Sequence, residues 1–225
     1  MPLKLALFDC DGTLADSQHA VVAGMRDAFA ACALPCPADG AIRTAIGLSL
    51  PRLIATLTPD ADADQQSALV DAYREAYFAH RAAAGASPEP LYDGIAACLD
   101  TLSAQGWQLG IATGKSQRGL VRLLDAHGIL DRFVTLQSAD HHASKPDPAM
   151  VMAAMAQTLT APAHTVVIGD TSFDMMMARS AGAHALGVGW GYHPVAELSA
   201  AGAHAIAQTP AAIPDALARL IGESA

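Results

Sequence analysis

The sequence alternates short apolar runs with segments long enough for a helix, and this alternation constrains the fold more than any other feature. The apolar runs are 3–8, 107–112, 133–136, 165–168 and 183–188, and the helix-length segments between them are 94–104, 117–127, 149–159 and 173–181. Short apolar runs bounded by turn residues suit strands that are buried on both faces. Strands alternating with helices imply crossover connections. The sequence therefore predicts an α/β fold with a doubly wound, Rossmann-like, mostly parallel sheet.

A long stretch without a strand-like run follows the first apolar run. Residues 16–87 are rich in Ala and Leu, and Gly and Pro divide them into several helices. We therefore expect an all-helical domain inserted into the α/β core. The predicted core comprises residues 1–15 and 88–225, and the predicted insertion residues 16–87. The Gly, Ser and Pro residues near its end are typical of a linker.

Composition and charge narrow the classes of function. With 52% hydrophobic and 16% charged residues, the chain can bury a core. Its net charge of −9 argues against nucleic acid as a partner. No apolar run approaches the ~20 residues of a membrane span, and the N-terminus lacks a signal-peptide pattern, so we expect a cytoplasmic protein. Cys32 and Cys36 have no second close pair with which to build a zinc site.

Polar residues follow the apolar runs, where the predicted strands end. Asp9 and Asp11 follow the first run, Thr113 the second and Asp170 the fourth, while Lys145 lies in the loop after the third. In an open parallel sheet, ligands bind outside the carboxyl ends of the strands. These residues should therefore gather at one edge of the sheet and form a site. An Asp-x-Asp-Gly turn alone would explain the first pair, but not the others.

The residue types at this edge suit phosphoryl chemistry. Asp9 and Asp11 lie two apart in an extended segment, so their side chains point the same way. They would raise each other's pKa unless a cation lay between them, and oxygen ligands suit Mg²⁺. A cation, a lysine and a hydroxyl together can receive a phosphoryl group. One carboxylate can then attack phosphorus while the other moves a proton.

Four motifs resemble, in order, those of the haloacid dehalogenase (HAD) superfamily. They are Asp9-Cys10-Asp11-Gly12-Thr13, Thr113, Lys145-Pro146 and Gly169-Asp170-Thr171-Ser172-Phe173-Asp174. The helical insertion falls where that superfamily carries its type I cap domain, so the resemblance covers nearly the whole chain. The sequence is most similar to the phosphoglycolate phosphatase branch.

The resemblance implies a role for each carboxylate. Asp9 would be the nucleophile and a Mg²⁺ ligand. Asp11 would be the general acid and base, ligating the metal through its backbone carbonyl. Asp170 would be a further Mg²⁺ ligand. Asp174 would support the metal site from outside its direct ligands or hold Lys145, although an acid early in a helix also complements the helix dipole.

The remaining motif residues would bind the phosphoryl group. The resemblance implies that the Thr113 hydroxyl and the Gly114 N–H contact phosphate oxygens, and that Lys145 neutralises both nucleophile and phosphate. Gly114-Lys115-Ser116 also looks like the end of a nucleotide-binding P-loop. That motif needs a glycine where this sequence has Leu109, which argues against it.

The sequence thus predicts an Mg²⁺-dependent phosphatase that hydrolyses a small phosphorylated metabolite through an aspartyl-phosphate, as a monomer or homodimer. A phosphomutase resembling β-phosphoglucomutase shares the same carboxylates and stays open as an alternative. A non-enzymatic phospho-aspartate signalling module is a second alternative, although it has no use for the insertion. Candidate contacts to a substrate carboxylate are the insertion's cations Arg43, Arg52, His80 and Arg81.

Overall fold

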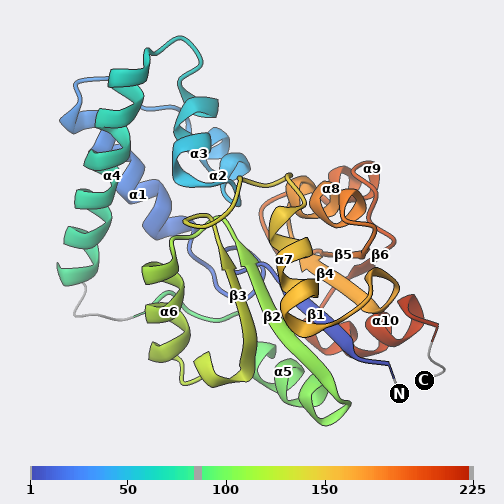
Figure 1. The fold of residues 1–225 in the computed structure, drawn as a ribbon. Coiled ribbons are helices and arrows are strands. Elements are labelled where there is room, and N and C mark those ends of the chain that lie inside the picture. Colours follow the sequence, from blue (N-terminus) through green and yellow to red (C-terminus); the bar gives the residue numbers. More distant parts are fainter. Residues whose placement is uncertain (1, 84–87, 223–225) are drawn as a thin grey trace.

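The computed structural model describes residues 2–83 and 88–222. Within these residues, six parallel strands form one sheet in the order β3-β2-β1-β4-β5-β6 (Figure 1). The strands are β1 (Lys4–Phe8), β2 (Trp107–Thr113), β3 (Phe133–Ser138), β4 (Thr165–Gly169), β5 (His184–Val188) and β6 (Ala205–Ala207). The predicted doubly wound parallel sheet is confirmed. The short strand β6 at one edge was not among the predicted strands.

Helices cover both faces of the sheet, as right-handed crossovers between parallel strands require. One face carries α5 (Ile95–Ala104), α6 (Gln117–Ala126) and α10 (Ile213–Leu220). The other carries α7 (Ala149–Thr158), α8 (Ser172–Ser180) and α9 (Val195–Ala200). Three short 3-10 turns, η1 (Leu130–Arg132), η2 (Pro162–His164) and η3 (Pro210–Ala212), lie in the connections.

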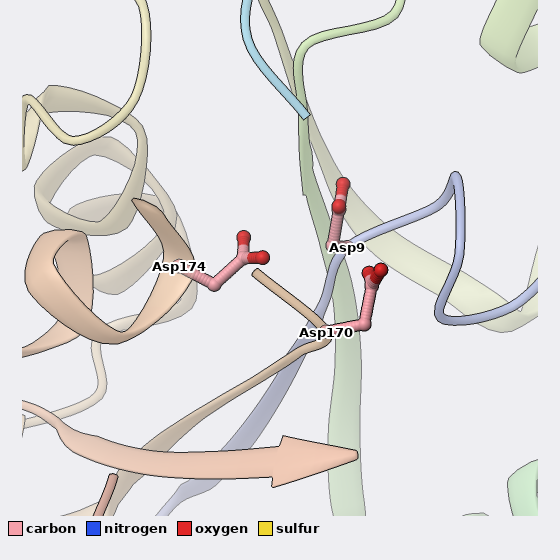
Figure 2. A group of neighbouring side chains, drawn as sticks. All are labelled: Asp9, Asp170 and Asp174. Atoms are coloured by element: carbon pink, nitrogen blue, oxygen red, sulfur yellow. The ribbon is translucent and has the colours of Figure 1, made fainter. Parts of the chain in front are cut away.

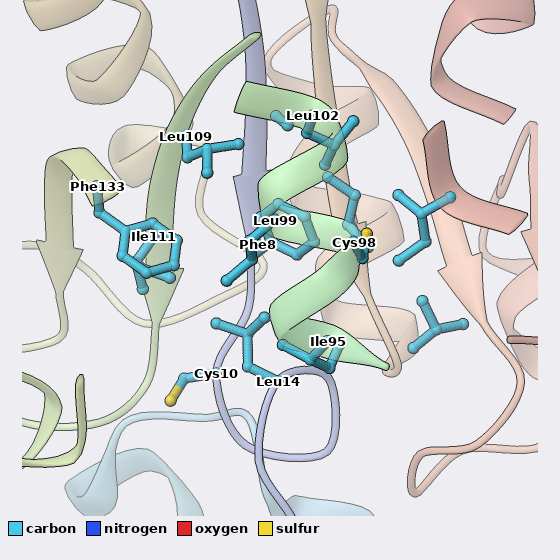
Figure 3. Packing of buried hydrophobic residues seen from close by; sticks show 14 of the residues in the cluster. Phe8, Cys10, Leu14, Ile95, Cys98, Leu99, Leu102, Leu109, Ile111 and Phe133 are labelled. Atoms are coloured by element: carbon cyan, nitrogen blue, oxygen red, sulfur yellow. The ribbon is translucent and has the colours of Figure 1, made fainter. Parts of the chain in front are cut away.

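Strand β1 is buried from both sides and ties the two hydrophobic layers together. Ala6 and Phe8 face the first layer, and Leu5 and Leu7 face the second, as the two-residue period of a strand dictates. Figure 3 shows Phe8 packed beside Leu99 of α5. This burial on both faces explains why the first apolar run contains almost no polar residue, and it fixes where the strand ends.

Four helices lie between β1 and α5, and no strand interrupts them among the described residues. They are α1 (Gln18–Ala31), α2 (Asp39–Ala45), α3 (Leu50–Leu57) and α4 (Ala63–Ala83). They share a hydrophobic cluster of their own, which includes Met25, Phe29, Ile54 and Leu69. Figure 1 shows these four helices beyond the carboxyl ends of strands β1 and β2. We refer to α1–α4 with their connections as the helical insertion.

The two connections to the insertion run side by side. Ala15 forms an isolated bridge with Leu91, and the backbone N–H of Asp16 donates to the carbonyl of Pro90 at 2.9 Å. The predicted boundary after residue 15 falls within this paired segment. The other boundary falls after residue 87, and residues 84–87 lie outside the described part of the chain. The division into domains at these residues stays a prediction.

Across residues 2–83 and 88–222, every helix is too short or too polar to cross a lipid bilayer.

Candidate active site

Three carboxylates converge at the carboxyl ends of two neighbouring strands. Asp9 follows β1, Asp170 follows β4, and Asp174 lies in the first turn of α8. One carboxylate oxygen from each lies within 4.8 Å of the other two (Figure 2). All three residues are at most 1% exposed. The pairing of β1 with β4 brings Asp9 and Asp170 together, as the strand-end argument predicts.

Lys145 joins this cluster from the loop after β3. Its Nζ lies 2.8 Å from Asp9 Oδ1 and donates to Asp174 Oδ1 at 2.6 Å, with all three side chains fully buried. Burial disfavours the charged ammonium, but Asp174 and Asp9 outweigh it and raise the pKa of Lys145. The lysine therefore stays charged. Lys145 pairs with two of the three carboxyl groups, so the cluster carries more negative than positive charge when all three are ionised.

A capping box fixes Asp174. Thr171 is the N-cap of α8, and its hydroxyl accepts from the Asp174 N–H at 3.4 Å. In return, Asp174 Oδ2 accepts from the backbone N–H of Thr171 at 3.1 Å. This reciprocal pattern is the ordinary start of a helix. The capping box occupies Asp174 Oδ2, and Asp174 Oδ1 accepts from Lys145 Nζ.

Hydrogen bonds and close backbone packing fix Asp170. Its Oδ1 accepts from the Thr13 hydroxyl at 2.8 Å, and its Oδ2 from the Tyr192 N–H at 2.9 Å. A Cβ on Gly12 or Gly191 would lie within 2.2 Å of Asp170 atoms, so only glycine fits at either position. Sequence reasoning missed the role of Gly191 and Tyr192. The signal was available, because both follow β5, the strand beside β4.

The cluster has the donor set of a hard divalent cation. Burial raises the pKa of Asp9 to about 7 and the pKa of Asp170 well above its usual range. Asp9 Oδ2 is buried and has no hydrogen-bond partner among the described residues. An ionised carboxylate in this position needs a positive partner. Carboxylate oxygens fit Mg²⁺, and Asp9 and Asp170 are the residues that would hold it, since Asp9 Oδ2 has no hydrogen-bond partner among the described residues and each Asp170 oxygen accepts one hydrogen bond.

The side chain of Asp11 lies apart from the cluster and pairs with Lys115. Asp11 Oδ1 is 2.9 Å from Lys115 Nζ, and both side chains are about one-tenth exposed. Burial disfavours a charged Lys115, but Asp11 holds its pKa well above the usual value. The Lys115 ammonium also lies over the ring of Tyr77 in α4, 5.9 Å from its centroid. Sequence reasoning considered Lys115 only within a P-loop and missed this contact.

Thr113 and Gly114 end strand β2 beside the insertion. Thr113 is 1% exposed, and its hydroxyl accepts from the Lys115 N–H at 3.2 Å. A Cβ on Gly114 would lie 2.5 Å or less from the carbonyls of Gly47 and Leu48, in the connection between α2 and α3. The insertion thus rests directly on the strand end, and position 114 requires glycine for that reason.

A cavity of about 270 Å³ lies between the insertion and the core. Asp11, Gly114 and Lys115 line it on the core side. Its cationic lining is Arg74, Lys115 and Arg122, which differs from the set singled out in the sequence. Arg43, Arg52 and His80 do not line it, and the side chain of Arg81 lies outside the described residues.

The haloacid dehalogenase-like hydrolase family model matches residues 6–188. The chain belongs to this family. It is 32% identical over 206 residues to a protein of Dickeya dadantii named probable phosphatase IndB, covering 91% of this chain and 89% of that relative. It is 31% identical to phosphoglycolate phosphatase of Thiobacillus denitrificans, covering 88% and 89%. The crystal structure of a hydrolase from Pseudomonas syringae superposes with a TM-score of 0.84 at 26% identity, covering 98% and 100%.

These similarities confirm the family inferred from the four motifs. The chain is a hydrolase of this family, and its similarity to phosphatases extends over most of its length. The structure brings Asp9, Lys145, Asp170 and Asp174 into contact range at one sheet edge. The roles assigned to the site residues stay predictions.

Metal binding should release protons, because Mg²⁺ and protons compete for Asp9. The pKa of this carboxyl in the metal-free fold is about 7, against an ordinary value of 3.8. The metal-free fold favours the protonated form of Asp9, so the contribution of this proton to the free energy of unfolding is lost as pH rises through 7. Mg²⁺ affinity should therefore rise between pH 5 and pH 8. Titration calorimetry in two buffers of different ionisation enthalpy measures the released protons. A pH-independent affinity without proton release would contradict this assignment.

Gly12→Ala should abolish the Mg²⁺ response, whereas Gly106→Ala should not. Both glycines have positive φ, +86° and +79°, so both substitutions carry a similar backbone strain of about 1–2 kcal/mol. Only the Cβ at position 12 displaces Asp170, since nothing lies within 4 Å of a Cβ at position 106. The readout is the rise in melting temperature on adding Mg²⁺. An unchanged rise in Gly12→Ala would show that Asp170 does not hold the metal.

Proposed function

We propose that this protein is an Mg²⁺-dependent phosphatase, similar to phosphoglycolate phosphatases, that hydrolyses a small phosphomonoester through a phosphorylated Asp9. One observation carries the proposal: a buried carboxylate with one unpartnered oxygen stands beside a buried lysine and a second fixed carboxylate. That oxygen is available to attack phosphorus. The phosphatase names of relatives more than 30% identical to the chain support the same activity.

In the first step, Asp9 Oδ2 attacks phosphorus and the bond to the ester oxygen breaks. Asp11 gives its proton to the departing alkoxide, which leaves as an alcohol. The Thr113 hydroxyl and the Gly114 N–H hold phosphate oxygens, and Lys145 offsets the negative charge that accumulates around Asp9. Asp9, Asp170 and the Asp11 carbonyl would hold Mg²⁺, which would supply further neutralisation of the charge on the phosphoryl group.

In the second step, water attacks phosphorus and the acyl-phosphate bond breaks. Asp11, now ionised, takes the proton from that water, and Asp9 is restored as free phosphate leaves. Lys115 positions the Asp11 carboxyl group for both proton transfers, because its Nζ lies 2.9 Å from Asp11 Oδ1. The burial of Asp9, Lys145 and Asp170 restricts the access of bulk water to this step.

The phosphomutase alternative shares Asp9, Asp11 and magnesium. A mutase would pass the phosphoryl group from Asp9 to a second hydroxyl of a sugar phosphate, whereas a phosphatase passes it to water. The products differ, and phosphorus NMR separates free phosphate from a sugar phosphate isomer. A signalling module would instead keep its phosphoryl group, and the cavity beside the site would have no ligand to hold.

Asp9→Asn should lower the turnover number for a generic alkyl phosphate by about a thousandfold or more, because the nucleophile is lost. Chelation of the metal should abolish turnover of the wild type. Asp125→Asn on the exposed surface of α6 is the matched control and should keep wild-type turnover. The assay measures free phosphate, and circular dichroism confirms folding. Substantial phosphate release by Asp9→Asn would refute the mechanism.

A further inference from the structure

The cavity begins where the proposed phosphoryl site ends. Asp11 and Gly114 line it, whereas Asp9, Lys145 and Asp170 do not. A phosphoryl group on Asp9 would therefore leave the cavity free for the rest of the substrate. A cavity of about 150 Å³ holds a benzene ring, so about 270 Å³ holds roughly ten non-hydrogen atoms. Glycolate, the leaving group of phosphoglycolate, has about half as many and would leave much of the cavity unfilled.

The wall contributed by the insertion is mostly apolar and aromatic, with Ser49 and Arg74 as further members. Its side chains include Val21, Leu48, Leu53, Tyr73, Tyr77 and Phe78. A polar two-carbon leaving group could not use this wall, because burying polar groups against it without partners costs free energy. A ring or a branched hydrocarbon would gain about 25 cal/mol for each Å² of apolar surface it buries there. The wall therefore selects a largely apolar body.

Among the described residues that line the cavity, one cation has no carboxylate partner. Lys115 pairs with Asp11, and Arg74 forms an ion pair with Asp71, with 3.2 Å between Arg74 Nη1 and Asp71 Oδ1. Arg122 has no carboxylate partner among the described residues and instead lies over the ring of Phe78, 5.8 Å from its centroid. Asp140 also lines the cavity but does not pair with Arg122. Its Oδ2 accepts from the Gln117 N–H at 2.8 Å.

We propose that the substrate is a phosphate ester whose leaving group has an apolar, ring-sized body and an anionic substituent, and that Arg122 selects this anion. The inference rests on the proposed phosphatase activity and specifies its substrate class. Arg122 belongs to the core helix α6, and Phe78 to α4 of the insertion. Their contact holds the guanidinium at the junction of the two walls, where the far end of a bound leaving group meets it.

Arg118 provides a matched control. Its guanidinium lies over the same Phe78 ring, 4.9 Å from the centroid, but Arg118 does not line the cavity. Replacing either arginine by glutamine removes one positive charge from α6 and one contact with Phe78. Only the replacement of Arg122 also removes a charge from the cavity. A difference between the two variants therefore reports on ligand recognition and not on the packing of the insertion.

The test compares 4-carboxybenzyl phosphate, benzyl phosphate and phosphoglycolate, which are all alkyl esters. The wild type should show a kcat/KM for 4-carboxybenzyl phosphate at least about tenfold above that for phosphoglycolate. The kcat/KM for 4-carboxybenzyl phosphate should also exceed the kcat/KM for benzyl phosphate by about fivefold, as expected for one partly exposed charge-assisted contact. Arg122→Gln should reduce this second ratio to near one, and Arg118→Gln should preserve it. A preference for phosphoglycolate, or an unchanged ratio in Arg122→Gln, would overturn the proposal.

Binding separates this inference from the proposed activity. Calorimetry with Asp9→Asn in the presence of Mg²⁺ measures the affinities of 4-carboxybenzyl phosphate and phosphoglycolate without turnover. Tighter binding of the carboxybenzyl ester, reduced by adding Arg122→Gln, supports the substrate class even if the wild type hydrolyses none of the three esters. Equal affinities would reject the substrate class even if hydrolysis occurs.

Discussion

The contact of Lys145 with Asp9 and Asp174 is the interaction on which the rest of the site depends. One buried ammonium pairs with two buried carboxylates, and separating buried charges from their partners costs several kcal/mol. The capping box of α8 and the hydrogen bonds to Asp170 hold these groups together against their repulsion. The charge that remains uncompensated explains why the site suits both a divalent cation and the transfer of a phosphoryl group.

In our proposal, the core carries out the chemistry and the helical insertion contributes to substrate selectivity. The parallel sheet places the charged groups at its carboxyl edge, and the helical insertion covers that edge. Because the carbonyls of Gly47 and Leu48 lie against Gly114, the insertion reaches the strand end itself. Its helices add an apolar wall to a cavity whose other wall carries Lys115 and Arg122. The core could therefore keep one mechanism while changes in the insertion alter which leaving group fits.

The sequence predicted the parts of the structure that depend on strand order along the chain. Buried parallel strands appear in the sequence as apolar runs, and their carboxyl ends lie at the same edge of the sheet. The proximity of Asp9 and Asp170 could therefore be predicted from their positions directly after two such runs. The strand at 205–207 was not predicted, because three residues are too few to show the two-residue hydrophobic period of a strand. The pairing of Lys115 with Asp11 and the position of Arg122 also escaped. The Lys115–Asp11 contact joins the ends of the neighbouring strands β2 and β1, and it was missed because Lys115 was considered only within a P-loop. The place of Arg122 in the cavity wall depends on how the insertion packs against the core, which helical periodicity does not determine.

The most direct test follows the phosphoryl group itself. Enzyme mixed with Mg²⁺ and an excess of alkyl phosphate is quenched in acid within one turnover, digested and analysed by mass spectrometry. Our account predicts the added mass of one phosphoryl group on Asp9, at a level that falls to zero once substrate is exhausted. Steady turnover with no phosphoryl group on Asp9 at any time, or with the group on another residue, would contradict it.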